Sequence, residues 1–189
     1  MLDKVAFEAS FQEFCSLIQT ISGHEFISFD EGLAAVEESY KPRLREFALQ
    51  ILDPESWQED EVGSGKILSR TIDAIEIHEP RKNLINNLVF WDNRYGHSTR
   101  AHRIFLEAKD DAKLCYQIET ILFDLYKSAL VDAGVFEKIN IATSGKYPLI
   151  AYLYFLKDPS KFMPILPSTY DKAFQKLGID LVTRRNCSW

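Results

Sequence analysis

Apolar residues recur along most of this chain at the spacing of an amphipathic helix. Near the N-terminus they form a stripe with intervals of four, three, four and three that stops at Gly23: Phe7, Phe11, Phe14, Ile18 and Ile21. Residues at this spacing share one side of a helix and need other helices to cover them. Alternating, β-branched stretches are confined to short pieces such as KINIAT and IDLVT. We therefore expect an all-α, mostly helical fold, an orthogonal multi-helix bundle of about eight helices with at most minor β structure.

Further helices are predicted from the same spacing and from end signals. They run over 28–40, 42–52, 68–79, 84–88, 98–108, 111–133, 148–156 and 167–178. Two of them begin with a capping-box pattern, Ser28 with Glu31 and Ser168 with Asp171, in which side chains satisfy the exposed amides of the first turn. Gly134 stands where the longest helix is expected to end.

The chain length of 189 residues and the hydrophobic content of 46% suffice for one helical domain over 1–189. Within it, 1–53 could form an N-terminal helical subdomain, followed by a flexible polar loop over 54–65. The three cysteines are far apart and lack metal-ligand spacing, which indicates neither disulfides nor a metal site. We expect a cytoplasmic protein without cofactor or membrane partner, since the longest apolar run, YPLIAYLYFL, is too short to span a bilayer.

One segment is basic in an otherwise acidic chain. Between Arg81 and Arg103 there are five cations and one acid, so this segment carries +4 and the rest of the chain −10, against a total of −6. Guanidinium groups match phosphate oxygens, and aromatic faces stack on bases. The segment therefore predicts a nucleic-acid-binding surface formed by Arg94, Tyr95, His97, Arg100, His102 and Arg103. A polar junction between helices, with Trp91 in the core, explains the same residues about as well.

A catalytic interpretation of the segment remains open beside the binding one. Small all-α ribonucleases of the HEPN class use an arginine followed after four to six residues by a histidine, and they cut RNA without metal. Here two residues separate Arg94 from His97 and seven separate it from His102, so the spacing departs from that pattern. In this hypothesis a histidine is the general acid or base, and Arg94 or Arg100 stabilises the charge on phosphorus.

Other motifs favour structural interpretations. GSGK at 63–66 lacks the first glycine, the final hydroxyl and the preceding strand of a phosphate-binding loop, so the start of a helix is favoured. His97 and His102 are five apart and do not share a helix face as zinc ligands require. An aromatic cluster could line a pocket for a base, although such clusters are more often core: Tyr147, Tyr152, Tyr154, Phe155, Phe162, Tyr170 and Phe174.

The C-terminal half also carries a family resemblance. The segments NNLVFWDNRYG and YPLIAYLYFLKDPSKFMPILPSTYDKAFQKLGID resemble the N-terminal helical region of bacterial proteins related to HNH-type and modification-dependent restriction nucleases. The resemblance implies a bacterial defence setting, DNA rather than RNA as the nucleic acid, and a nuclease domain or subunit as a partner. It carries over no catalytic residue, because this chain has no HNH signature.

Three hypotheses from different classes follow from the sequence. The first is a non-enzymatic DNA recognition or accessory module of a restriction-type system. The second is a metal-free HEPN-like ribonuclease. The third is a protein-protein interaction scaffold, whose sign is an exposed apolar patch on a helix pair.

Overall fold

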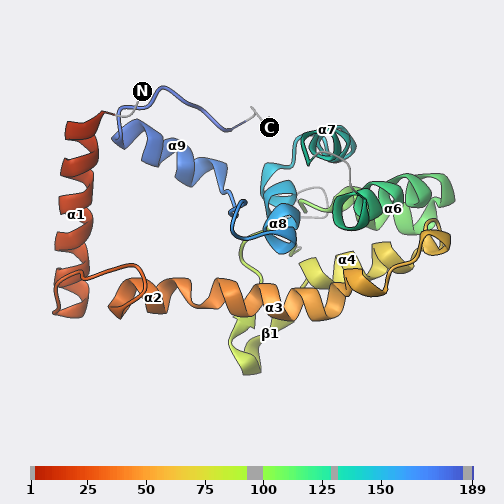
Figure 1. Ribbon diagram of the computed structural model, residues 1–189, viewed down its shortest axis with the longest axis horizontal. Helices are drawn as coiled ribbons and strands as arrows, with labels where there is room; N and C mark the ends of the chain where they lie inside the picture. The colour runs from red at the N-terminus through yellow and green to blue at the C-terminus, as the bar shows by residue number, and fades with distance from the viewer. Residues whose placement is uncertain (1–2, 93–99, 129–131, 185–188) are drawn as a thin grey trace. The chain divides into compact units, whose positions relative to one another are not determined.

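The computed structural model describes residues 3–92, 100–128, 132–184 and 189, and this part of the chain is mostly helical with minor β structure, as the sequence predicted (Figure 1). It divides into two compact units. Unit 1 comprises 1–43 and 167–184, and unit 2 comprises 44–166 and 185–189. The boundary between them falls inside helix α3 (Tyr40–Leu52), whereas the expected subdomain ended at 53. The single-domain organisation stays a prediction.

Unit 1 contains three complete helices in its described residues: α1 (Lys4–Ser22), α2 (Gly32–Glu38) and α9 (Pro167–Lys176). Asp3 caps α1 by accepting hydrogen bonds from the Val5 and Ala6 amides, and Gly23 ends it in the left-handed conformation that the sequence predicted. The Ser28 capping box is wrong: the Ser28 hydroxyl accepts from Asp30 N within a turn, and α2 begins only at Gly32.

The predicted capping box of α9 is replaced by a longer-range contact. The helix already begins at Pro167, so Asp171 lies inside it. Its carboxylate accepts hydrogen bonds from the backbone and hydroxyl of Thr183 and from the Arg184 amide. These bonds hold the pKa of Asp171 below its ordinary value, the Thr183 hydroxyl contributing most. Asp171 therefore fastens the segment that follows α9 back onto the helix.

Unit 2 is built around α8 (Tyr147–Lys157), which is buried on every side from Leu149 to Leu156. Unit 2 also contains α3 from Leu44 onward and the helices α4 (Lys66–Ile75), α5 (Arg103–Glu107), α6 (Ala112–Lys127) and α7 (Asp132–Thr143). Two tyrosines tie α8 to its neighbours: Tyr152 donates to the Ala74 carbonyl of α4 at 2.7 Å, and Tyr126 of α6 donates to Leu153 O at 2.9 Å. Figure 1 shows α8 beside α7 and α6.

The polar loop before α4 is anchored in this core. It forms two short 3-10 turns, η1 (Pro54–Ser56) and η2 (Glu59–Glu61). Between them Trp57 is buried at 1% exposure and donates from Nε1 to Leu52 O at 2.9 Å. The loop is therefore packed against the unit rather than separating two parts of it.

Several predicted helices were wrong in type or extent. The helix expected over 68–79 ends at Ile75, and His78–Glu79 form a strand. The segment expected as a helix over 84–88 is the second strand of a hairpin, β1 (His78–Glu79) and β2 (Leu84–Ile85), joined by the turn η3 (Pro80–Lys82). The long helix over 111–133 ends at Lys127, and α7 then carries Gly134 in its interior. The predicted start of α5 at Ser98 lies outside the described residues, and α5 begins at Arg103.

Candidate functional site

The GSGK loop binds a carboxylate of the chain itself. Glu119, fully buried on α6, accepts hydrogen bonds through Oε2 from Gly63 N at 2.6 Å and Gly65 N at 3.2 Å. Its other oxygen accepts from Leu68 N in the first turn of α4 at 2.8 Å. Exposed amides at a glycine-rich helix start attract anions, and here Glu119 satisfies that attraction. The loop therefore has a structural function. The sequence signal for this contact was Glu119 itself, an acid within the apolar stripe of α6.

The predicted nucleic-acid surface is only partly visible. Arg94, Tyr95 and His97 lie outside the described residues. Trp91, from the same segment, donates from Nε1 to the Asn86 carbonyl at 2.6 Å and is half-buried against the hairpin.

In the described part of that surface, two of the predicted residues contact an acid that was not predicted from the sequence. Glu76, the residue that directly follows α4, lies within hydrogen-bonding distance of His102 Nε2, at 2.7 Å, and 3.7 Å from the Arg100 guanidinium. The His102 ring is fully buried, and the Arg100 side chain is largely so. His102 and Arg100 are therefore buried or largely buried in contact with Glu76 instead of facing solvent.

Arg103 is the predicted binding residue with the most accessible side chain among those described. It is about half exposed, and its Nε lies 3.0 Å from Glu107, one turn further along α5. Such an exposed pair is weak and can exchange partners with a bound anion. The structure thus turns Arg103 toward solvent, unlike Arg100 and His102.

A polar cavity of about 250 Å³ lies beside Arg103. Its other side is the turn between α7 and α8, where exposed Ser144 has a left-handed φ of 52° and exposed Lys146 follows two residues later. Within the described ranges Lys146 has no carboxylate within 4.0 Å. Two cations and a hydroxyl, offset by Glu107 alone, make this cavity a fitting place for an anion.

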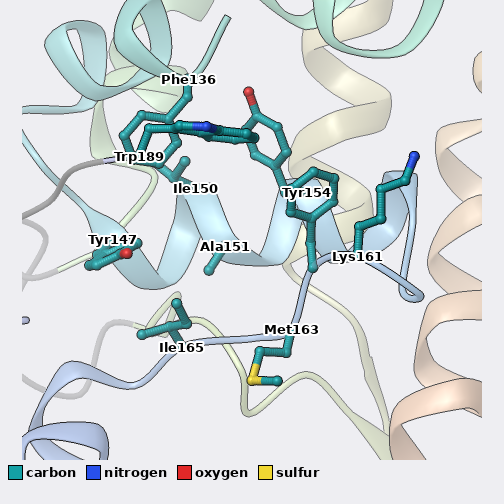
Figure 2. Close-up of a pocket in the computed structure, with 10 residues that line it drawn as sticks. Phe136, Tyr147, Ile150, Ala151, Tyr154, Lys161, Met163, Ile165 and Trp189 are labelled. Carbon is teal, nitrogen blue, oxygen red and sulfur yellow. The ribbon is translucent and has the colours of Figure 1, made fainter. Parts of the chain in front are cut away.

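A second cavity, of about 260 Å³, is lined mainly by aromatic and apolar residues. One of them, Tyr147, directly follows Lys146 of the polar cavity in the chain. The rings of this second cavity come from α7, from α8 and its following loop, and from the end of the sequence: Phe136, Tyr147, Tyr154, Phe162 and Trp189. Figure 2 shows Phe136 and Trp189 at one edge and Met163 and Ile165 at the opposite edge. This volume is slightly smaller than that of typical small-ligand pockets, which begin at about 300 Å³.

The rings of this cavity differ in how firmly they are held. Tyr154 and Phe136 are buried, and the Tyr154 hydroxyl donates to the Asp132 carbonyl at 2.6 Å. Burial, followed by the Asp132 charge, raises the pKa of Tyr154. Trp189 lies 5.6 to 5.7 Å from Phe136, Tyr154 and Phe162, measured between ring centroids, yet is 56% exposed. Trp189 is thus a half-covered wall against which a flat ligand can stack.

Part of the lining of this cavity was predicted from the sequence. Tyr147, Tyr154 and Phe162 belong to the predicted aromatic cluster and line the cavity, whereas Tyr152 and Phe155 are buried in the core. Tyr170 and Phe174 pack on each other in α9 of unit 1. Phe136 and Trp189 were missed, since no local pattern connects them with α8.

Metal and membrane features are lacking in the part of the chain that the structure describes. In those ranges no three His, Cys, Asp or Glu side chains are grouped closely enough to hold a metal ion. Burial raises the pKa of the Cys115 thiol, which disfavours its reactive thiolate. No described helix has the length and apolar character needed to cross a membrane.

Comparison with known proteins returned no relatives. No protein-family model, curated protein or solved structure matches the chain. The resemblance to restriction-nuclease helical regions therefore stays a prediction.

Proposed function

We propose that this chain is a non-enzymatic nucleic-acid recognition module that takes an unpaired or flipped base into the aromatic cavity. In this proposal Arg103 and Lys146 bind a phosphate next to that base. The binding surface is thereby shifted from the predicted segment toward the start of α8.

The observation that carries the proposal is that two consecutive residues line the two cavities, one residue each. Lys146 lines the polar cavity and Tyr147 lines the aromatic one, and neighbouring Cα atoms are about 3.8 Å apart. A nucleotide needs this combination, a cationic place for its phosphate and an aromatic wall for its base. Exposed Trp189 supplies the wall with the most accessible face.

The charge of the protein supports a local rather than a general affinity. A total of −6 repels a polyanion at most of the surface. Only a ligand that gains base stacking in addition to phosphate contact overcomes that repulsion. We therefore propose single strands, or duplexes with a displaced base, as the preferred ligands, and DNA over RNA on the strength of the resemblance to restriction nucleases.

The ribonuclease hypothesis has weaker support. Its general acid or base, if His102, is fully buried with Nε2 engaged by Glu76, so a phosphate does not reach it without rearrangement. Arg94 and His97 lie outside the described residues, and this hypothesis stays a prediction.

Fluorescence anisotropy with labelled oligonucleotides tests the proposed function. Single-stranded DNA, matched duplex, duplex with one mismatch and single-stranded RNA are titrated in chelator with wild type, Trp189→Ala and the double variant Arg103→Gln/Lys146→Gln. Exposed Tyr116→Ala and Lys109→Gln/Lys113→Gln are the matched controls.

We expect the single strand and the mismatched duplex to bind more tightly than the matched duplex. Trp189→Ala is expected to weaken binding by about tenfold or more, since stacking on one base contributes about 1–3 kcal/mol. Absence of binding at low salt, or equal binding by the site variants and their controls, would refute the proposal.

A further inference from the structure

Unit 1 leaves much of its apolar surface open. Five phenylalanine rings pack together between α1 and α2, each with a ring centroid within 6.3 Å of another: Phe7, Phe11, Phe14, Phe26 and Phe29. Yet Ala34 is the only buried residue among those described in this unit, and Phe29 is 63% exposed. The aromatic cluster therefore lacks the cover that a hydrophobic core ordinarily has.

A groove of about 470 Å³ runs beside this cluster. Its apolar floor and lip come from the end of α1, the following loop and the start of α2: Ile18, Phe26, Ile27 and Leu33. Ile27 stands at the lip with 77% exposure. Figure 1 shows α1, the loop and α2 that form these walls. The groove is large enough to take apolar side chains from another helix.

Carboxylates border the groove. Glu25 and Glu31 line it, and within the described ranges neither has a cation within 4.0 Å. From Lys4 to Glu38 the chain has seven acids and one base, and that base, Lys4, lies 3.7 Å from Glu8. The groove thus combines an apolar floor with an uncompensated negative rim.

From this combination we infer that the α1–α2 groove is a docking site for a basic amphipathic helix of a partner protein. Apolar residues of such a helix fill the groove, and its lysines or arginines face Glu25 and Glu31. The same rim argues against the other occupants of an apolar face. A second copy brings acid against acid, and nucleic acid or an anionic bilayer meets the same repulsion. This docking site lies in unit 1 and does not depend on the proposed nucleotide site in unit 2.

Anisotropy with a fluorescein-labelled amphipathic peptide of leucine and lysine tests the inference on the full chain. One control peptide carries glutamate in place of lysine, and another has the same composition with leucines spread around the helix. The protein variants are Ile27→Ser and Glu25→Gln/Glu31→Gln. Their matched controls are Ile141→Ser, also exposed, and Glu59→Gln/Asp60→Asn in unit 2.

We expect only the amphipathic basic peptide to bind at micromolar concentration. Ile27→Ser is expected to weaken it about tenfold, because one isoleucine loses its burial, and the double charge variant about fivefold. The control variants keep wild-type affinity. Equal binding of the acidic or scrambled peptide, or equal binding by the groove variants, overturns the inference. So does self-association or vesicle binding that Ile27→Ser abolishes, since the occupant is then a second copy or a membrane.

Discussion

The Glu119 carboxylate on α6 lies 2.6 Å from the Gly63 amide, fifty-six positions earlier in the chain. Together with Gly65 N and Leu68 N, this contact fixes the loop that precedes α4. Left-handed φ values of 93° at Gly63 and 82° at Gly65 point the amides at one acceptor, a conformation that glycine adopts readily. A buried carboxylate thus takes the role that a bound anion has in phosphate loops.

We predict that Glu119→Gln lowers the free energy of unfolding by about 2–3 kcal/mol, because charge-assisted bonds are removed and an amide group faces amide donors. Chemical denaturation measures the effect. Glu137→Gln on the exposed face of α7 is the control and should change stability by less than about 0.5 kcal/mol. A Glu119→Gln protein as stable as that control would show that the loop does not depend on the carboxylate.

Alkaline pH should destabilise unit 2. Burial raises the pKa of Tyr126 and Tyr152 well above the ordinary value, so both stay protonated in the folded chain at a pH where the unfolded chain ionises them. The stabilisation is complete below about pH 10 and declines as pH rises further, by about 1.4 kcal/mol per tyrosine and pH unit.

Denaturation at pH 9 and pH 11 measures this loss. In Tyr152→Phe the decline between the two values should be smaller by about 1.4 kcal/mol, because one ionising group is removed from the unfolded chain. The exposed Tyr116→Phe should retain the wild-type pH dependence. An identical decline in both variants would contradict the prediction.

His102→Ala should act on stability rather than on catalysis. Removing the buried ring breaks its contact with Glu76, at an expected cost of about 1–3 kcal/mol. Labelled RNA incubated with wild-type protein in chelator should remain intact on a denaturing gel. Cleavage that disappears in a folded His102→Ala protein, but persists in His24→Ala, would instead support the ribonuclease hypothesis.

Salt dependence should separate the two parts of the proposed nucleotide site. For a single strand, each phosphate that a cation neutralises contributes about 0.7 to the slope of log affinity against log salt. Arg103→Gln/Lys146→Gln should therefore flatten the slope by up to about 1.4. Trp189→Ala should lower affinity at every salt concentration and leave the slope unchanged, since stacking releases no counterions. The reverse assignment of the two effects would contradict the roles proposed for these residues.

The elements predicted correctly from sequence are those whose signals are local. Gly23 ends α1 because its left-handed φ of 75° suits glycine, and this preference needs no distant partner. The apolar run around Leu153 predicted a buried helix, since a segment without a polar face has no side to turn toward water. The helix predicted over residues 84–88 was wrong because two-residue strands are determined by cross-strand pairing, here of His78 with Ile85, rather than by the periodicity of side chains.

The amino-acid sequence by itself determined that the chain is mostly helical and where several helices end, because periodicity and capping act over one or two turns. Tertiary structure alone decided which polar and aromatic groups meet. It buried His102 against Glu76, left Arg103 exposed, and brought Trp189 against Phe136 across more than fifty positions. Those contacts depend on how helices pack, and a buried charge or ring takes its partner from whichever element lies nearest in space.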